Sequence, residues 1–125
     1  MRKLLHQHTI SFRHAFEGLF WAFRTQPNFR VHGILSILAI GFSIFFHITS
    51  AEFSIIIFTI VLGVTGEMIN TAIECMTDLI TTEWKEQAKL AKDVAAGMML
   101  FIALGSVGVA FAIFGPYILT FLHLR

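Results

Sequence analysis

Two long stretches without a charged residue constrain the fold of this chain more than any other feature of its sequence. Residues 31–51 form an uncharged run of 21 residues and residues 94–124 one of 31 residues. A helix needs about 20 apolar residues to cross the hydrocarbon core of a bilayer, so each run is long enough to span a membrane. Of all residues, 56% are hydrophobic and 14% charged, whereas soluble domains carry about 25% charged residues. The sequence therefore predicts an integral membrane protein.

The composition also excludes several classes of protein. The low polarity excludes a disordered chain, and the single cysteine excludes a disulfide framework or a cysteine-rich metal site. A net charge of +1 provides no basic surface for nucleic acid. The length of 125 residues allows one domain, residues 1–125. We expect this domain to be an all-α integral membrane fold without a soluble part.

A third span is expected between the other two. Residues 53–66 are uncharged but too short to cross a bilayer, so we place Glu67 within the membrane or at its edge. The predicted spans are about 30–48, 52–76 and 94–122. Three spans put the N-terminal cations and the lysines of residues 85–92 on one side of the membrane. Since Lys and Arg favour cytoplasmic loops, the N-terminus is expected in the cytoplasm and the C-terminus outside.

An amphipathic helix is predicted before the first span, over about residues 11–26. Its large apolar residues recur at helical spacing and share one face, which leaves Arg13, Glu17 and Arg24 off that face. These residues are Phe12, Phe16, Leu19, Phe20 and Phe23. Such a helix lies in the membrane interface rather than across it. Pro27 is expected to end it, because the residue before a proline disfavours helical geometry.

The second span carries a row of polar residues on one helical face. At about 100° per residue, one stripe contains Glu67, Asn70, Glu74 and Asp78. Carboxylates in hydrocarbon are costly and usually face a protein interior or a wet cavity. Their oxygens suit a divalent cation such as Mg²⁺, with one carboxylate left over as a general base. Equally, the carboxylates could emerge at a solvated helix end and pair with Lys85, Lys89 and Lys92, and the periodicity leaves both readings open.

Four segments carry a resemblance to a known family. They read SFRHAFEG at 11–18, NFRVH at 28–32, EMINTAIE at 67–74 and AKLAKDVAAG at 88–97. In order and spacing they resemble the small prokaryotic lipid kinases, the family of diacylglycerol kinases and undecaprenol kinases. Within this family the chain is most similar to the Gram-positive branch of undecaprenol kinases. The resemblance covers about residues 11–115.

The resemblance implies a fold and a reaction. It implies a homotrimeric helical bundle of three-span subunits with an N-terminal surface helix, in the inner or plasma membrane of a bacterium. The reaction is the Mg²⁺-dependent transfer of the γ-phosphoryl group of ATP to a lipid alcohol. Undecaprenol is the expected acceptor, which would give undecaprenyl phosphate, and diacylglycerol, which would give phosphatidic acid, is the alternative.

The resemblance also implies roles for individual residues. Glu67 is the catalytic base and Asn70 positions that carboxylate or the phosphoryl group. Glu74 binds Mg²⁺ and ATP. The other residues expected to bind ATP are Glu83, Lys85, Lys92, Asp93 and His14. Two positions depart from the family pattern: Gln26 stands where an acidic metal ligand is usual, and Lys85 stands where many relatives have His.

Two functions of other classes fit the same apolar composition. One is a small oligomeric membrane transporter in which Glu67 binds a cation within the membrane. The other is a membrane scaffold without enzymatic activity, which would tolerate Glu67→Gln. The lysine-rich segment directly after the polar stripe favours the kinase, because it suits a nucleotide and has no evident purpose in a carrier.

Overall fold

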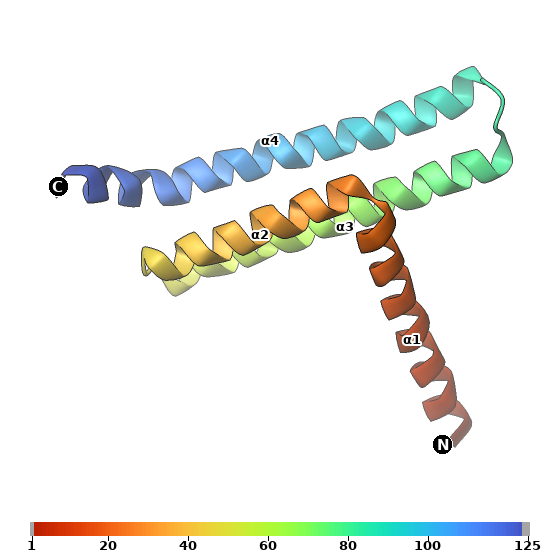
Figure 1. Cartoon of the computed structure of the whole chain (residues 1–125), viewed down its shortest axis with the longest axis horizontal. Coiled ribbons are helices and arrows are strands. Elements are labelled where there is room, and N and C mark those ends of the chain that lie inside the picture. The colour runs from red at the N-terminus through yellow and green to blue at the C-terminus, as the bar shows by residue number, and fades with distance from the viewer. Residues whose placement is uncertain (1, 124–125) are drawn as a thin grey trace.

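The protein is built from four α-helices (Figure 1). In a computed structural model, which describes residues 2–123 and the side chains of residues 12–123, they are α1 (Arg2–Thr25), α2 (Pro27–Phe45), α3 (Ser50–Ile80) and α4 (Glu86–His123). The described residues contain no strand. By length and composition α2, α3 and α4 can each cross a membrane. The predicted all-α membrane fold is confirmed, while residues 1, 124 and 125 of the expected single domain lie outside the described residues.

The junction of α1 and α2 is set by one proline. Pro27 occupies the first turn of α2, where its missing N–H leaves no hydrogen bond unmade. Gln26, just before it, has extended backbone angles, as the proline ring requires. The sequence pattern predicts a helix from about residue 11, and α1 begins at Arg2. The two helices meet at a sharp angle, so α1 points away from the other three (Figure 1).

The apolar face of α1 has little protein to cover it. Phe12 and Phe16 are about two thirds exposed, and Phe20 and Phe23 about half exposed. α1 packs against α2, its neighbour in the chain, and it points away from the bundle formed by the other helices (Figure 1). A helix with an uncovered aromatic face and charged residues beside it is suited to lie along a membrane surface.

Two glycines let α3 approach its neighbours closely. A Cβ on Gly63 would lie 3.2 Å from Nδ1 of His32 on α2. A Cβ on Gly66 would lie 2.5 Å from Cδ1 of Ile102 and 3.2 Å from Sδ of Met99, both on α4. Small residues are typical of close helix contacts in membranes. The central position of α3, which packs against both α2 and α4, therefore depends on these two residues.

Polar contacts join the α2–α3 turn to α3 and α4. The Thr49 side chain accepts a hydrogen bond from the Glu52 backbone N–H, and the Glu52 carboxylate accepts one from the Thr49 N–H, which forms a capping box. The Tyr117 hydroxyl of α4 donates to the same carboxylate at 2.8 Å. His47 in the turn has a positive φ of 50°. These contacts hold the end of the bundle that lies opposite the α3–α4 loop (Figure 1).

Candidate active site

The polar stripe of α3 is buried in its N-terminal part. Glu67 is 2% exposed, and Asn70 and Thr71 are each 5% exposed. Glu74 is half-buried and Asp78 is exposed, so the stripe runs from the interior of the bundle towards water. The spacing that placed these residues on one face is that of the long, regular helix Ser50–Ile80. Glu67 and Asn70 therefore lie in the interior of the bundle, on a face of α3 that continues to its exposed end.

Three buried atoms of this stripe have no hydrogen-bond partner. The Asn70 amide N–H donates to Oε1 of Glu74 at 3.1 Å, and Oδ1 of the same side chain has no partner. Oε2 of Glu67 and Oγ1 of Thr71 are also unpaired. Leaving a buried polar group without a partner costs roughly 1–3 kcal/mol, and more for a charged group. Each unpaired polar atom in a native interior calls for an explanation, and a bound reactant, ion or water is one.

The start of α2 completes the surroundings of Glu67. Asn28 and His32 lie close enough to Glu67 to influence its carboxylate, as does Glu74 on α3 itself. Sequence reasoning assigned no role to Asn28 or His32, although both belong to the NFRVH segment that contributed to the resemblance. The signal that could have found them is the spacing of four residues, which places both on one face of α2.

The acidic and basic residues near the α3–α4 loop form three pairs. Lys92 Nζ lies 2.5 Å from Asp78 Oδ1 and so links α4 to α3. Lys89 pairs with Asp93 within α4 at 2.5 Å, and Lys85 pairs with Glu83 in the loop at 3.1 Å. All six side chains are at least 40% exposed. Exposed pairs contribute at most about 1 kcal/mol, so these lysines can exchange their partners for phosphate oxygens at little cost.

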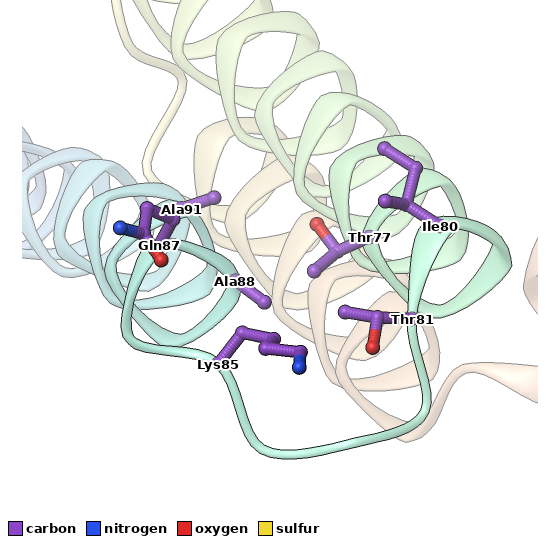
Figure 2. Close-up of a pocket in the computed structure, with 7 residues that line it drawn as sticks. All are labelled: Thr77, Ile80, Thr81, Lys85, Gln87, Ala88 and Ala91. Atoms are coloured by element: carbon purple, nitrogen blue, oxygen red, sulfur yellow. The ribbon is translucent and has the colours of Figure 1, made fainter.

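A pocket of about 480 Å³ opens between the end of α3 and the start of α4, and Lys85 is among the residues that line it (Figure 2). Its polar lining comes from Thr77, Thr81, Lys85 and Gln87. Thr77 continues the face of α3 that carries Asn70 and Glu74, so the pocket prolongs the polar stripe. Thr81 and Gln87 are further residues that sequence reasoning did not single out.

Within one chain, His14 lies apart from this region. His14 Nδ1 is 3.1 Å from Oε2 of Glu17 on its own helix, and α1 extends away from the bundle (Figure 1). Gln26 is half-buried at the junction of α1 and α2, and its side chain makes no capping hydrogen bond. The chain therefore brings together Glu67, Asn70 and Glu74. Near the α3–α4 loop it pairs Lys85 with Glu83, Lys92 with Asp78 and Asp93 with Lys89, and it does not bring His14 to either region.

The ligands for a metal ion are few. Among the described residues, no group of three or more His, Cys, Asp or Glu side chains could hold a metal ion by itself. Glu74 offers a half-buried carboxylate, and the Asn70 amide hydrogen-bonds to it. One or two carboxylates are what Mg²⁺ requires when phosphate oxygens and water supply the other ligands. The donor set therefore fits an ion that binds together with a nucleotide.

Comparisons with known proteins place this arrangement in a family. The family model described as prokaryotic diacylglycerol kinase matches residues 13–114. A diacylglycerol kinase of Synechocystis sp. is 35% identical over 89% of this chain, which spans 64% of that relative. An undecaprenol kinase of Bacillus subtilis is 36% identical over 92% of this chain and 94% of its own length. A diacylglycerol kinase of Haemophilus influenzae is 32% identical over 79% of this chain and 83% of its own length.

The fold, the buried carboxylate and these relatives show that the protein is a bacterial membrane protein of the lipid kinase class. The resemblance found in the sequence is confirmed. The chain belongs to the prokaryotic diacylglycerol kinase family.

Proposed function

We propose that the protein transfers the γ-phosphoryl group of ATP to a membrane lipid alcohol, with undecaprenol as acceptor and undecaprenyl phosphate as product. The observation that carries the proposal is Glu67, a carboxylate buried in a membrane-spanning helix with Oε2 unpaired, on a stripe that leads to a pocket lined in part by Lys85. The choice of undecaprenol rests on the Bacillus subtilis relative, which is matched over 94% of its length.

Glu67 acts as the general base in this proposal. Its unpaired Oε2 accepts the proton of the lipid hydroxyl while the hydroxyl oxygen attacks the γ-phosphorus. The bond between that phosphorus and the bridging oxygen breaks, and ADP leaves with the electron pair. Asn70 is fixed by its hydrogen bond to Glu74, so its free Oδ1 lies at a constant place beside the reacting groups. Phosphoryl transfer depends mainly on such positioning and on neutralising charge.

The residues beyond the stripe bind ATP. Lys92 and Lys85 supply cationic point charges for phosphate oxygens. Asp93 and Glu83 hold lysine side chains in place until the nucleotide binds, through their pairs with Lys89 and Lys85. Magnesium bound with the nucleotide would be held by Glu74 and by the amide oxygen of Gln26, and it supplies neutralisation of the triphosphate charge.

The proposal extends to topology and assembly. The loop end of the bundle, with its lysines, lies in the cytoplasm together with the N-terminus, and the C-terminus lies outside. We expect a homotrimer, in which α1 of one subunit reaches the stripe of its neighbour. In support, His14 lies away from the other proposed ATP-binding residues within one chain, and α1 extends free of the bundle (Figure 1).

The experiment described below also tests two other functions. Diacylglycerol is the acceptor if the substrate follows the Synechocystis and Haemophilus relatives, whose names are diacylglycerol kinase. A carrier that uses Glu67 to bind a cation would transfer no phosphate. Lys85 in the pocket and the exposed Lys92 near the α3–α4 loop favour the kinase over the carrier.

The test is phosphoryl transfer by the purified protein in lipid bilayers. Protein, Mg²⁺ and ATP labelled at the γ-phosphate are incubated with undecaprenol in one reaction and with diacylglycerol in another. Labelled undecaprenyl phosphate in clear excess over labelled phosphatidic acid is the expected result. Labelling of phosphatidic acid alone would reassign the acceptor, and labelling of neither lipid, while a control kinase is active, would refute the proposal.

The first prediction concerns the base. Glu67→Gln removes the proton acceptor and keeps the side-chain size, so we expect turnover to fall by about 10²–10⁴-fold. The matched control is Glu52→Gln on the same helix, because glutamine also supports a capping box. This control should retain turnover per folded molecule. Equal activity of the two variants would remove Glu67 from the mechanism.

A further inference from the structure

Most hydroxyl groups on the described helices bond to their own backbone. They donate to the carbonyl oxygen four residues earlier, at 2.7–2.9 Å. These hydroxyls belong to Thr25, Ser36, Ser43, Ser54, Thr59, Thr77, Ser106 and Thr120. A hydroxyl that donates in this way is satisfied within its helix and needs no other acceptor.

Thr71 departs from this pattern. Its side chain is buried, as are those of Ser43 and Thr77, yet its Oγ1 has no hydrogen-bond partner. The carbonyl four residues earlier is that of Glu67, in the same long helix α3, so the backbone offers Thr71 the bond that the other hydroxyls make. A buried hydroxyl that does not make this bond is free to donate to a side chain or a reactant.

The Glu67 carboxylate is the unpaired acceptor that Thr71 can meet. Thr71 follows Glu67 by four residues, so the two side chains lie one above the other, about 40° apart around the helix axis. Oε2 of Glu67 is buried and unpaired. An ionised carboxylate only accepts hydrogen bonds, whereas a hydroxyl donates one. One turn of α3 thus holds a buried acceptor without a donor and a buried donor without an acceptor.

Asn70 is not the partner of this hydroxyl, although its Oδ1 is also unpaired. It directly precedes Thr71, and adjacent residues of a helix point about 100° apart and do not face each other. The Asn70 amide is also held by its bond to Glu74. Along the stripe, the acceptor within reach of Thr71 is therefore Glu67.

We infer that Thr71 is a positioning residue, whose hydroxyl donates a hydrogen bond to Oε2 of Glu67 when both substrates are bound and so aims this oxygen at the acceptor hydroxyl. The inference rests on the proposed function, in which Glu67 is the base. A carboxylate oxygen has two lone pairs, so Oε2 accepts from Thr71 and still takes the proton of the lipid alcohol.

The chemistry of the pair supports this role. A hydrogen bond to an ionised acceptor is stronger than one to a neutral acceptor, so the Thr71 hydroxyl favours Glu67 in the form that can take a proton. Catalytic hydrogen bonds often reach their final geometry only in the complex with substrate. Nucleotide and lipid therefore complete a contact for which α3 already supplies both atoms.

Two variants of Thr71 test the positioning role in bilayers. Thr71→Val keeps the branched shape and removes the hydroxyl, so kcat should fall by about tenfold or more, with KM for ATP and for the lipid unchanged. Thr71→Ser restores the hydroxyl and should recover most of the lost rate. An unchanged kcat in Thr71→Val, or a Thr71→Ser variant no faster than Thr71→Val, would overturn the inference.

Stability separates positioning from a structural role. Thr71→Val removes a buried polar group that has no partner, so the variant should resist denaturant in detergent at least as well as the wild-type protein. The matched control is Ser43→Ala, which removes a buried hydroxyl that donates to the Ala39 carbonyl and should leave kcat unchanged. Parallel loss of stability and activity in Thr71→Val would make Thr71 structural.

A double variant tests whether Thr71 acts through Glu67. In Glu67→Gln, whose residual transfer is measured with labelled ATP, adding Thr71→Val should cause no further loss, because no base remains to be aimed. A further loss as large as that in the wild-type background would show that Thr71 acts independently and would overturn the inference. The proposed function fails separately, only if the wild-type protein transfers no phosphate to a lipid.

Discussion

The carboxylates of this protein differ in whether their oxygens have hydrogen-bond partners. The carboxylates of Glu17, Glu52 and Asp78 each accept hydrogen bonds, although all three lie at or near the surface. Glu67, the carboxylate that is buried, retains an unpaired oxygen. Under the proposed mechanism, this unpaired oxygen is the atom that accepts the proton of the lipid hydroxyl.

At this scale, Glu17 supports a prediction on pH. Its hydrogen bond from Arg13, followed by that from His14, lowers the pKa of the Glu17 carboxyl below its ordinary value. Because the folded-state pKa is depressed, the pairing stabilises α1 above the ordinary pKa and is lost as the pH falls through the lowered pKa. Arg13→Ala should move the pKa of Glu17 upwards, as measured by NMR titration of ¹³C-labelled glutamate in micelles.

The control for this titration is Arg24→Ala. Arg24 lies on the same helix, and its guanidinium stacks over the Phe20 ring at 4.5 Å instead of pairing with Glu17. The pKa of Glu17 should not respond to this change. An identical response to both substitutions would mean that general charge on α1, and not the Arg13 hydrogen bond, sets the pKa.

Among the elements, α3 depends on its close approach to α4. In Gly66→Ala the new Cβ meets the end of the Ile102 side chain, which must move, so we expect a loss of stability of about 1 kcal/mol. In Gly105→Ala the new Cβ meets nothing within 4 Å, and stability should be unchanged or slightly higher. Unfolding in detergent by denaturant measures both. Equal stabilities would show that the contact at Gly66 does not limit packing.

The elements were predictable from sequence to different degrees. Uncharged runs and apolar spacing predicted three spans and a surface helix, because bilayer thickness and helical period act locally. The same spacing predicted the face shared by Glu67, Asn70 and Glu74. Contacts between distant segments, such as that of Tyr117 with Glu52, were not predictable, since nothing in either local sequence indicates the partner. The spacing of Asn28 and His32 places both on one face of α2, but nothing in the local sequence indicated that this face lies beside Glu67.

For the whole molecule, one chain holds two groups of proposed site residues but leaves His14 apart from both. If α1 of one subunit completes the stripe of another, inactive variants should complement each other. We expect mixed oligomers of Glu67→Gln and His14→Ala to regain a fraction of wild-type transfer when the two proteins are co-expressed. The measurement is γ-phosphate transfer after purification by tags on both variants.

The controls for complementation use the same preparation. Each variant co-expressed with itself should remain inactive or weakly active, and native mass spectrometry should show three subunits in each species. Mixed oligomers no more active than the sum of the two parents would mean that each site is complete within one subunit. Oligomers of another size would overturn the proposed trimer without affecting the proposed chemistry.

The turn between α2 and α3 is only the four residues from Phe46 to Thr49, and it is tied down by the capping box and Tyr117. Under the proposed topology, this end offers almost nothing to the compartment outside the cell. The protein is then a one-sided catalyst, which can serve only alcohol present in the leaflet that faces ATP. Lipid arriving in the other leaflet would have to be flipped first, so transbilayer movement would set the supply of substrate.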